Sequence, residues 1–191
     1  IFAHFRTNNN EANVFLVACP ETRKAFLIDA GSFDPRIRKF IADKGLQLSG
    51  IFITHNHYDH TDGLADMIEE YDPQVFAGIS SINSLPAKQL HQDDSIEIGK
   101  MQGRCIMLPG HTPESMGLVL PGMVFTGDAL FSGSIGGTAN IHNMAIEIDH
   151  IRRHLFTLPE YYLVHTGHGP SSTIGIEKRH NPFFVDRKSV V

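Results

Sequence analysis

The sequence predicts an α/β fold that forms one domain over residues 1–191. Short runs rich in β-branched and aromatic residues alternate with segments whose apolar residues recur at helical spacing. The chain is long enough for one domain with a sizeable core, and no linker, repeat or low-complexity tract divides it. Several polar motifs follow directly after predicted strands, which is where α/β folds usually place their chemistry.

The first part of the chain predicts three strands. Residues 1–6 have the pattern of a strand, and the apolar runs 13–19 and 25–30 predict two more. The intervening segment 20–24 reads Pro-Glu-Thr-Arg-Lys and predicts a hairpin between the second and third strands.

Two amphipathic helices are predicted on either side of a strand at residues 51–54. Asp34 suits the N-cap of the first helix, Pro35 its first helical position and Gly45 its C-terminal stop. Apolar stripes at helical spacing support both helices. These stripes are Ile37, Phe40 and Ile41 in the first helix, then Leu64, Met67, Ile68 and Tyr71 in the second.

The second half of the chain predicts further strands and a third helix. The expected strands cover residues 75–77, 95–98, 104–108, 117–120, 123–126 and 161–164. The helical stripe consists of Met144, Ile148, Ile151 and Leu155. Pro159 closes this helix, and residues 171–178 can form a short one. The polar segment 80–94 fits no element, while the glycine- and serine-rich segment 132–140 predicts a loop that is flexible or shaped for a ligand.

A cluster of histidines follows the strand at 51–54. Residues 54–60 read Thr-His-Asn-His-Tyr-Asp-His, which brings His55, His57, Asp59 and His60 together in the sequence. In an extended backbone the first two histidines project to one side, because strand side chains alternate. Imidazole nitrogens and carboxylate oxygens are natural ligands of zinc and similar divalent metals. Four ligands are too many for one tetrahedral site, so the cluster predicts two metals roughly 3.5–4 Å apart.

Three later motifs can supply the remaining ligands. His111 lies in a Pro-Gly-His-Thr-Pro loop after a buried strand, and His168 lies between two glycines just past another strand. Asp128 stands between Gly127 and an apolar run, where a buried carboxylate needs a partner or a metal. A position between two metals would satisfy that need.

Three other polar residues are not predicted to be metal ligands. Asp29, at the end of a strand, is either a turn residue or a group that orients a metal-bound histidine. His165 is expected to be such a supporting group or a structural residue, and His91 a surface residue.

The composition excludes several classes of function. The formal net charge is -5 without a basic stripe, so binding to nucleic acid through phosphate contacts is not expected. No segment reaches the apolar length of a membrane span, and no signal peptide is visible at the start. Cys19 and Cys105 lie in apolar runs, and we expect reduced core residues of a cytoplasmic protein.

Taken in order, the polar motifs resemble those of the metallo-β-lactamase superfamily. They are His-x-His-x-Asp-His from His55, Pro-Gly-His-Thr at His111, Thr-Gly-Asp at Asp128 and Gly-His-Gly-Pro at His168. Ile-Asp-Ala-Gly at 28–31 resembles a further motif of the family. Within the superfamily, residues 125–136 and 167–183 are similar to the glyoxalase II group, in particular to its short, single-domain hydrolases.

The resemblance implies a four-layer αβ/βα sandwich, with two sheets face to face between helices. It also implies two divalent metal ions at one edge, zinc by default, with iron or manganese as the other options. The first metal would be held by His55, His57 and His111, the second by Asp59, His60 and His168, with Asp128 bridging both.

The implied reaction is hydrolysis of a small-molecule thioester, for example an S-(2-hydroxyacyl)glutathione. A hydroxide that bridges the two metals would attack the thioester carbonyl, with Asp59 and Asp128 as the catalytic carboxylates. One metal would stabilise the oxyanion and the other the departing thiolate. The alternatives are a persulfide dioxygenase with one iron and a metal-binding member of the fold without catalysis.

The chain departs from the family in two places. Many members carry Arg-Thr-Asp after Ser-Ile-Gly, whereas residues 137–140 here read Gly-Thr-Ala-Asn, which puts the anchoring of this loop in doubt. Full-length glyoxalase II enzymes also have a C-terminal helical region that helps to hold glutathione. This sequence ends at residue 191, so those glutathione contacts cannot be carried over.

Overall fold

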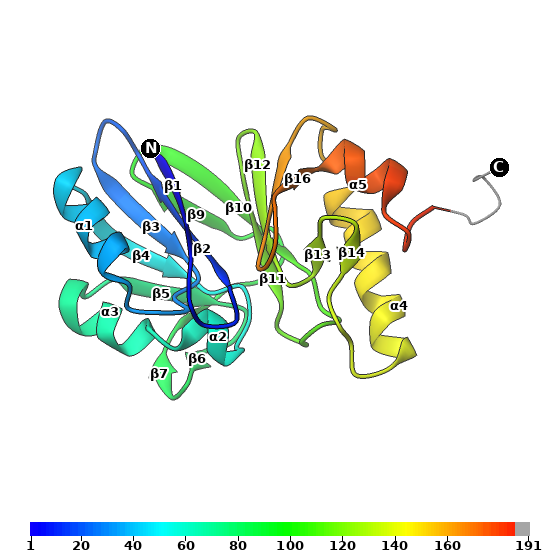
Figure 1. The fold of residues 1–191 in the computed structure, drawn as a ribbon, viewed down its shortest axis with the longest axis horizontal. Helices are drawn as coiled ribbons and strands as arrows, with labels where there is room; N and C mark the ends of the chain where they lie inside the picture. Colours follow the sequence, from blue (N-terminus) through cyan, green and yellow to red (C-terminus); the bar gives the residue numbers. More distant parts are fainter. Residues whose placement is uncertain (186–191) are drawn as a thin grey trace.

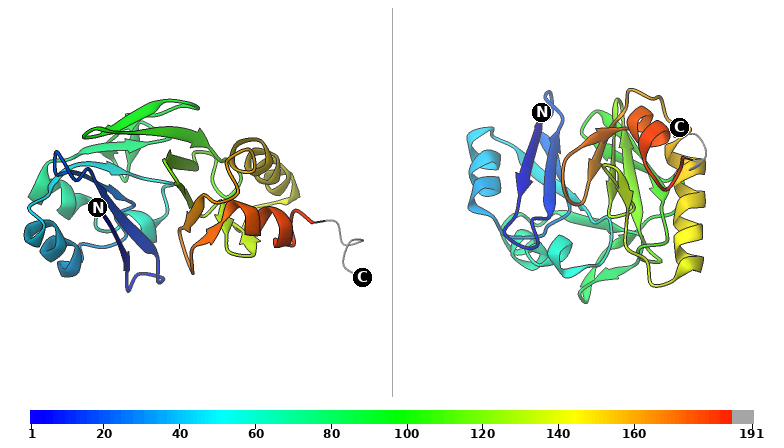
Figure 2. Two further views of the ribbon diagram at one scale, coloured as in Figure 1. Left: turned by 90° about the horizontal axis from the view of Figure 1, so that it is seen from above. Right: turned by 45° about the vertical axis from the view of Figure 1, so that its right-hand side comes forward.

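Two β-sheets pack face to face, and helices cover the outer face of each sheet (Figure 1). The computed structural model describes residues 1–185, and in this part of the chain each of the two main sheets has six strands. Figure 2 shows the layers from above, with the blue and cyan helices on one side and the yellow and red helices on the other. The αβ/βα sandwich is therefore confirmed, while residues 186–191 of the predicted domain lie outside the described residues.

The first sheet is built from the N-terminal half of the chain. In spatial order, its strands are β1 (Phe2–Arg6), β2 (Asn13–Ala18), β3 (Lys24–Ile28), β4 (Gln47–Phe52), β5 (Gln74–Ala77) and β8 (Lys88–Gln89). The pairs β1–β2 and β2–β3 are antiparallel, whereas β3, β4, β5 and β8 are parallel. Helices α1 (Pro35–Asp43) and α3 (Leu64–Tyr71) connect the parallel strands, and the single turn α2 (Tyr58–Thr61) precedes α3. The predicted cap of α1 is confirmed, because the Asp34 side chain accepts a hydrogen bond from the Arg36 backbone.

The second sheet is built from the C-terminal half. In spatial order, its strands are β16 (Ser172–Thr173), β15 (Leu163–Thr166), β12 (Met123–Gly127), β11 (Met116–Leu120), β10 (Met101–Met107) and β9 (Ser95–Ile98). Strands β12 and β15 are parallel, so their connection crosses over the sheet through α4 (Ile141–His150) and a π-helical turn (Ile151–Leu155). Helix α5 (Ile174–His180) packs beside them. Within residues 1–185, every helix is too short or too polar to cross a lipid bilayer.

The space between the two sheets is filled with aromatic and aliphatic side chains. Phe15, Phe26 and Phe52 from the first sheet meet Leu118 and Phe125 from the second, and each is at most 3% exposed. Full burial of one such side chain contributes about 1.5–3 kcal/mol to the free energy of unfolding. The two cysteines are buried and unbridged, as predicted. This apolar layer fixes the distance between the two halves, and hence between the strand ends that carry the polar motifs.

Strand β4 begins at Gln47, well before the predicted start at residue 51. The reason is Gly50, where a Cβ would come 2.3 Å from the ring of Phe26 on the neighbouring strand. The glycine therefore makes room for a core ring inside the strand, so the strand continues through it toward the N-terminus.

Other predicted segments also differ from the structure. The unassigned segment 80–94 contains β8 and a small hairpin of β6 (Ser81–Ile82) and β7 (Leu85–Pro86). The predicted loop 132–140 contains β14 (Ser134–Ile135), which pairs with β13 (Leu130–Phe131). Strand β15 begins two residues after the predicted residue 161, and the last helix begins at Ile174, after β16. Strand β8 pairs with β5 of the first sheet, whereas β6–β7 and β13–β14 are local hairpins whose two-residue strands are too short to show a period.

His165 is a structural residue of the core between the sheets. Its ring stacks on Phe2 and Phe125, with centroid distances of 4.9 and 5.1 Å, and its Nδ1 lies 2.8 Å from Ser171 Oγ. Burial lowers its pKa to about 4. The native state therefore holds this imidazole neutral at a pH where the unfolded chain would protonate it.

We expect His165 to make the free energy of unfolding depend on pH. Its contribution is fully present above about pH 6.5 and is lost as the pH falls toward about 4, since only the unfolded chain binds the proton in that window. The loss from this one residue is on the order of 3 kcal/mol. Chemical denaturation at pH 4.5 and 7.5 measures it, and His165→Gln should show a smaller difference than the wild type. An equal difference in both proteins would contradict this role.

Candidate metal centre

The fold brings all seven predicted ligands together, although they come from four separate segments. Each segment follows the carboxyl end of a strand, where side chains leave the sheet and can converge. The segments and their ligands are His55, His57, Asp59 and His60 after β4, His111 after β10, Asp128 after β12 and His168 after β15.

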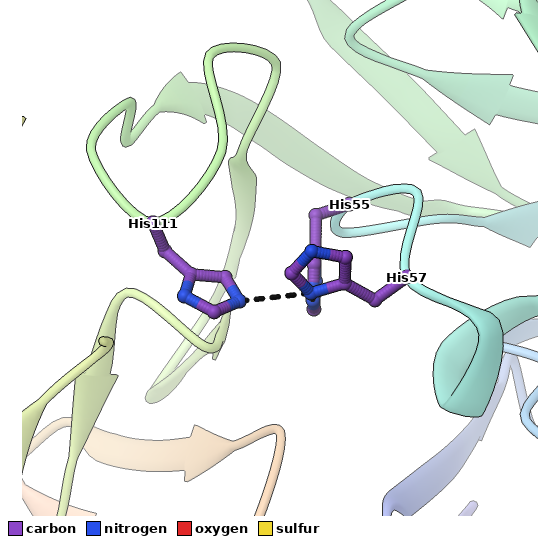
Figure 3. Close-up of side chains that lie close together, drawn as sticks. All are labelled: His55, His57 and His111. Atoms are coloured by element: carbon purple, nitrogen blue, oxygen red, sulfur yellow. Dashed lines mark hydrogen bonds between the residues drawn. The ribbon is translucent and has the colours of Figure 1, made fainter. Parts of the chain in front are cut away.

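The first group consists of His55, His57 and His111, and one ring nitrogen of each lies within 4.8 Å of the others. His57 Nδ1 lies 3.1 Å from His55 Nε2 and 3.0 Å from His111 Nε2. Figure 3 shows His111 approaching the other two rings from a loop on the opposite side. Three nitrogen ligands with this convergence can hold one divalent metal ion.

The second group consists of Asp59, His60 and His168, again with donor atoms within 4.8 Å of one another. His60 Nε2 lies 3.2 Å from His168 Nε2, which in turn lies 3.4 Å from Asp59 Oδ2. Asp59 and His60 are buried, whereas His168 is partly exposed, so this group opens to the surface on the side of His168.

Asp128 lies between the two groups. Its Oδ2 is 3.7 Å from His111 Nε2 in the first group and 3.5 Å from His168 Nε2 in the second. Its Oδ1 is 3.4 Å from His60 Nε2, yet it is buried and makes no hydrogen bond among the described residues. A buried carboxylate oxygen without a hydrogen bond needs a positive partner, which a metal ion would supply. The donors present therefore fit a pair of divalent ions.

The histidine rings are held by hydrogen bonds on the side away from the cluster. His60 Nδ1 donates to Asp29 Oδ2 at 2.8 Å, and His111 Nδ1 donates to the Gly137 carbonyl at 2.6 Å. His168 Nδ1 donates to the Asn10 carbonyl at 3.1 Å. In the neutral imidazole, each of these bonds leaves the Nε2 lone pair directed into the cluster, as a metal ligand requires.

Asp29 supports the cluster from inside the first sheet. Besides His60, it accepts hydrogen bonds from the Thr54 backbone at 2.8 Å and from the Thr54 hydroxyl at 2.9 Å. That hydroxyl lies 3.0 Å from His55 Nδ1. Asp29 also has φ 61° but belongs to no assigned turn, so of the two interpretations left open by the sequence the structure supports the group that orients histidines.

The electrostatics of the cluster favour a bound cation. Burial lowers the pKa of His55 to about 2, so its imidazole is neutral and its lone pair is free. Burial opposes ionisation of Asp128, but the adjacent His60 imidazole, with smaller contributions from His55 and His168, outweighs it and lowers its pKa to about 2. Burial also disfavours protonation of His60, yet the Asp29 and Asp128 carboxylates outweigh it and raise the pKa to about 10. The buried carboxylates thus attract positive charge to this point.

Glycines keep the space around the carboxylates clear. A Cβ at Gly167 would lie 2.0 Å from Asp128 Oδ1, and one at Gly136 would lie 2.0 Å from the Asp128 carbonyl oxygen. A Cβ at Gly31 would lie 2.0 Å from the Asp59 carbonyl oxygen. The glycines in these motifs are therefore required by close approach to the ligands.

Although residues 137–140 differ from the family pattern, hydrogen bonds hold this loop in place. The Gly137 carbonyl holds His111, and the Asn140 side chain caps α4 by accepting from the Asn143 backbone at 2.9 Å. Behind the loop, Glu147 is fully buried, and its Oε1 accepts from the His111 backbone at 3.1 Å. Burial raises the pKa of Glu147 to about 8.

Sequence reasoning missed two residues that touch ligands, Glu147 and Asn10. Glu147 lies inside the apolar stripe of its helix, three residues after Met144, and a charged residue in such a stripe was a usable signal. Asn10 is the last of three consecutive asparagines, and nothing in the sequence distinguishes its role from those of Asn8 and Asn9.

Comparison with known proteins agrees with this geometry. A family model of the metallo-beta-lactamase superfamily matches residues 8–97. The chain is 30% identical to hydroxyacylglutathione hydrolase GloC of Haemophilus influenzae, over 85% of this chain and 88% of that protein. The present chain spans about half the length (48%) of two longer relatives that are named hydroxyacylglutathione hydrolase.

Two solved structures are similar over nearly the whole chain. ETHE1 from Myxococcus xanthus has a TM-score of 0.87 and 32% identity, covering 95% of this chain and 83% of that one. TTHA1623, in a di-iron-bound form, has a TM-score of 0.79 and 28% identity, covering 95% of this chain and 99% of that one. From its motifs, its four-layer fold and these relatives, the chain belongs to the metallo-β-lactamase superfamily.

Proposed function

We propose that this cluster binds two divalent metal ions and that the protein hydrolyses a thioester, as enzymes of the glyoxalase II group do. The observation that carries the proposal is the arrangement of the donors into two groups of three that share no residue. A third group, His55, His60 and Asp128, overlaps both, and Asp128 lies within 4 Å of members of each. The resemblance to GloC supports a glutathione thioester as the substrate class.

The ligands of each metal follow from the two groups. His55, His57 and His111 would hold one ion, and Asp59, His60 and His168 would hold the other, with Asp128 shared. Imidazole and carboxylate donors suit zinc, iron and manganese alike. Zinc remains the first choice, and the di-iron-bound TTHA1623 supports iron as an alternative.

The reaction needs an activated water and stabilisation of negative charge on the carbonyl oxygen. When bound, two divalent ions supply a water that is acidified toward neutral pH and a Lewis acid beside it. Asp59 and Asp128, at most 9% exposed, would accept a hydrogen bond from that water and orient it. Both cysteines are buried and neither is among the ligands, so the hydrolysis relies on no thiol nucleophile.

A surface cavity borders this cluster at His168. It has a volume of about 490 Å³, and its walls include His168, Asn10, His4 and Arg6. The guanidinium of Arg6 is largely exposed and lies 3.7 Å from Glu11 without a hydrogen bond, so it remains available to a carboxylate. A glutathione conjugate carries such carboxylates, which is consistent with the proposed substrate class.

We expect metal-dependent hydrolysis of S-lactoylglutathione. Zinc-loaded and iron-loaded protein should be assayed by loss of thioester absorbance, with metal content measured on the same samples. His57→Ala and Asp128→Ala should each lose bound metal and at least about 100-fold of the activity, because each removes a donor from the cluster. Full turnover by either variant after metal depletion would contradict the proposal.

Gly167→Ala should weaken metal binding although it changes no ligand. The new methyl group would overlap Asp128 Oδ1 and press on His60, so we expect a destabilisation of about 1–3 kcal/mol and at least about 10-fold weaker metal affinity. Gly137→Ala is the matched control, since it keeps the backbone carbonyl that accepts from His111 and nothing lies within 4 Å of its added methyl group. Equal metal affinity in the two variants, measured by competition with a chelator, would show that the close approach at Gly167 is unimportant.

Two alternative functions have distinct outcomes in the same experiments. A persulfide dioxygenase would bind one iron per chain and consume oxygen with glutathione persulfide, and it would not hydrolyse thioesters. A metal-binding protein without catalysis would retain both ions and turn over neither substrate.

A further inference from the structure

One residue of the turn between β1 and β2 contacts two of the candidate ligands. The carbonyl of Asn10 accepts a hydrogen bond from His168 Nδ1 at 3.1 Å, and its side-chain Nδ2 donates to Asp59 Oδ2 at 3.1 Å. Asp59 follows the first sheet and His168 follows the second. Asn10 therefore links the two halves of the molecule at the second group of ligands.

The backbone of this turn has an unusual conformation. Asn10 has φ 51° and Glu11 has φ 56°, so two consecutive residues other than glycine lie in the left-handed region. Asparagine is one of the few residues that adopt this region readily, because its short side chain can form local hydrogen bonds. The conformation turns both the carbonyl and the amide of Asn10 toward the ligands.

The turn is also anchored on both sides. Asn9 Nδ2 donates to the Gly31 carbonyl at 3.2 Å, and Gly31 lies against Asp59. Asn13 donates from its backbone to the Gly167 carbonyl at 2.8 Å and from its side chain to the Thr166 carbonyl at 2.9 Å. These bonds tie the turn to the segments before and after the second group, so its position relative to the ligands is fixed.

The two contacts of Asn10 prepare the ligands in different ways. The bond to its carbonyl keeps the proton of His168 on Nδ1, which leaves the Nε2 lone pair facing Asp59 and Asp128. The bond from its amide fixes one oxygen of Asp59 without adding charge near the cluster. Groups that orient metal ligands in this way typically contribute 10- to 100-fold to metal affinity.

We propose that Asn10 is a positioning residue that sets the affinity of the second group, Asp59, His60 and His168, for its metal. The inference rests on the proposed binding of two metals, and it adds that Asn10 affects the metal of the second group and not the metal of the first. Asn10 hydrogen-bonds to two ligands of the second group, and no hydrogen bond joins it to His55, His57 or His111 in the described chain. Loss of its side chain should therefore affect one metal and leave the other unchanged.

The test is Asn10→Gly, with Asn8→Gly as the matched control. Glycine keeps the left-handed backbone and the carbonyl, so the substitution removes only the amide contact with Asp59. Asn8 lies two residues away in the same turn, is exposed, and makes no side-chain hydrogen bond among the described residues. Both zinc affinities of the full chain should be measured by chelator competition, together with thermal unfolding of the metal-free proteins.

We expect the second zinc to bind about 10- to 100-fold more weakly in Asn10→Gly, with the first affinity unchanged and Asn8→Gly like the wild type. Equal weakening of both zincs, or the same loss in Asn8→Gly, would show a general effect of the turn and overturn the inference. So would two unchanged affinities. A wild-type protein that binds no second metal would overturn the two-metal proposal as well, which separates the two failures.

Discussion

The burial of the Asp128 carboxylate is the constraint on which the rest of the site depends. It is 9% exposed and lies within 3.9 Å of ring nitrogens from His55, His60, His111 and His168. A carboxylate at such a position is costly unless positive charge compensates it. The histidines and the glycines around Asp128 are therefore consequences of one requirement, a space at the strand ends that holds negative charge and admits a cation.

The fold meets this requirement by assembling the cluster from both halves of the chain. The first sheet supplies His55 to His60, and the second supplies His111, Asp128 and His168. Neither half of the chain alone contains all three members of the first group or of the second group. The packing of phenylalanines between the two sheets therefore also assembles the site. Asp29, on the first sheet, and Asn10, in the turn beside it, then fix the rings and carboxylates whose positions the packing sets only approximately.

The residues that converge in the cluster could be predicted from the sequence because each lies in a short motif after a strand. Spacing within residues 55–60 and the glycines beside His168 are local signals, and so is the cap at Asp34. Asn10 could not be assigned, because its contact with His168 joins residues 158 positions apart. Glu147 interrupts an apolar stripe, which is a local signal, but its partner His111 lies 36 positions away. The early start of β4 likewise depends on the neighbouring strand β3, whereas β14 pairs with β13 in a local hairpin of two-residue strands, which are too short to show a period. Local patterns therefore identified the residues of the cluster, whereas the contacts that support them could be recognised only in the folded structure.

The most direct test of two metals around Asp128 is crystallographic. Anomalous difference maps from zinc-loaded crystals, collected above and below the zinc absorption edge, locate each ion independently of any assay. We expect two peaks per chain roughly 3.5–4 Å apart, one beside His57 and one beside His168, with Asp128 between them. A single peak, or two peaks that do not share Asp128, would contradict the account.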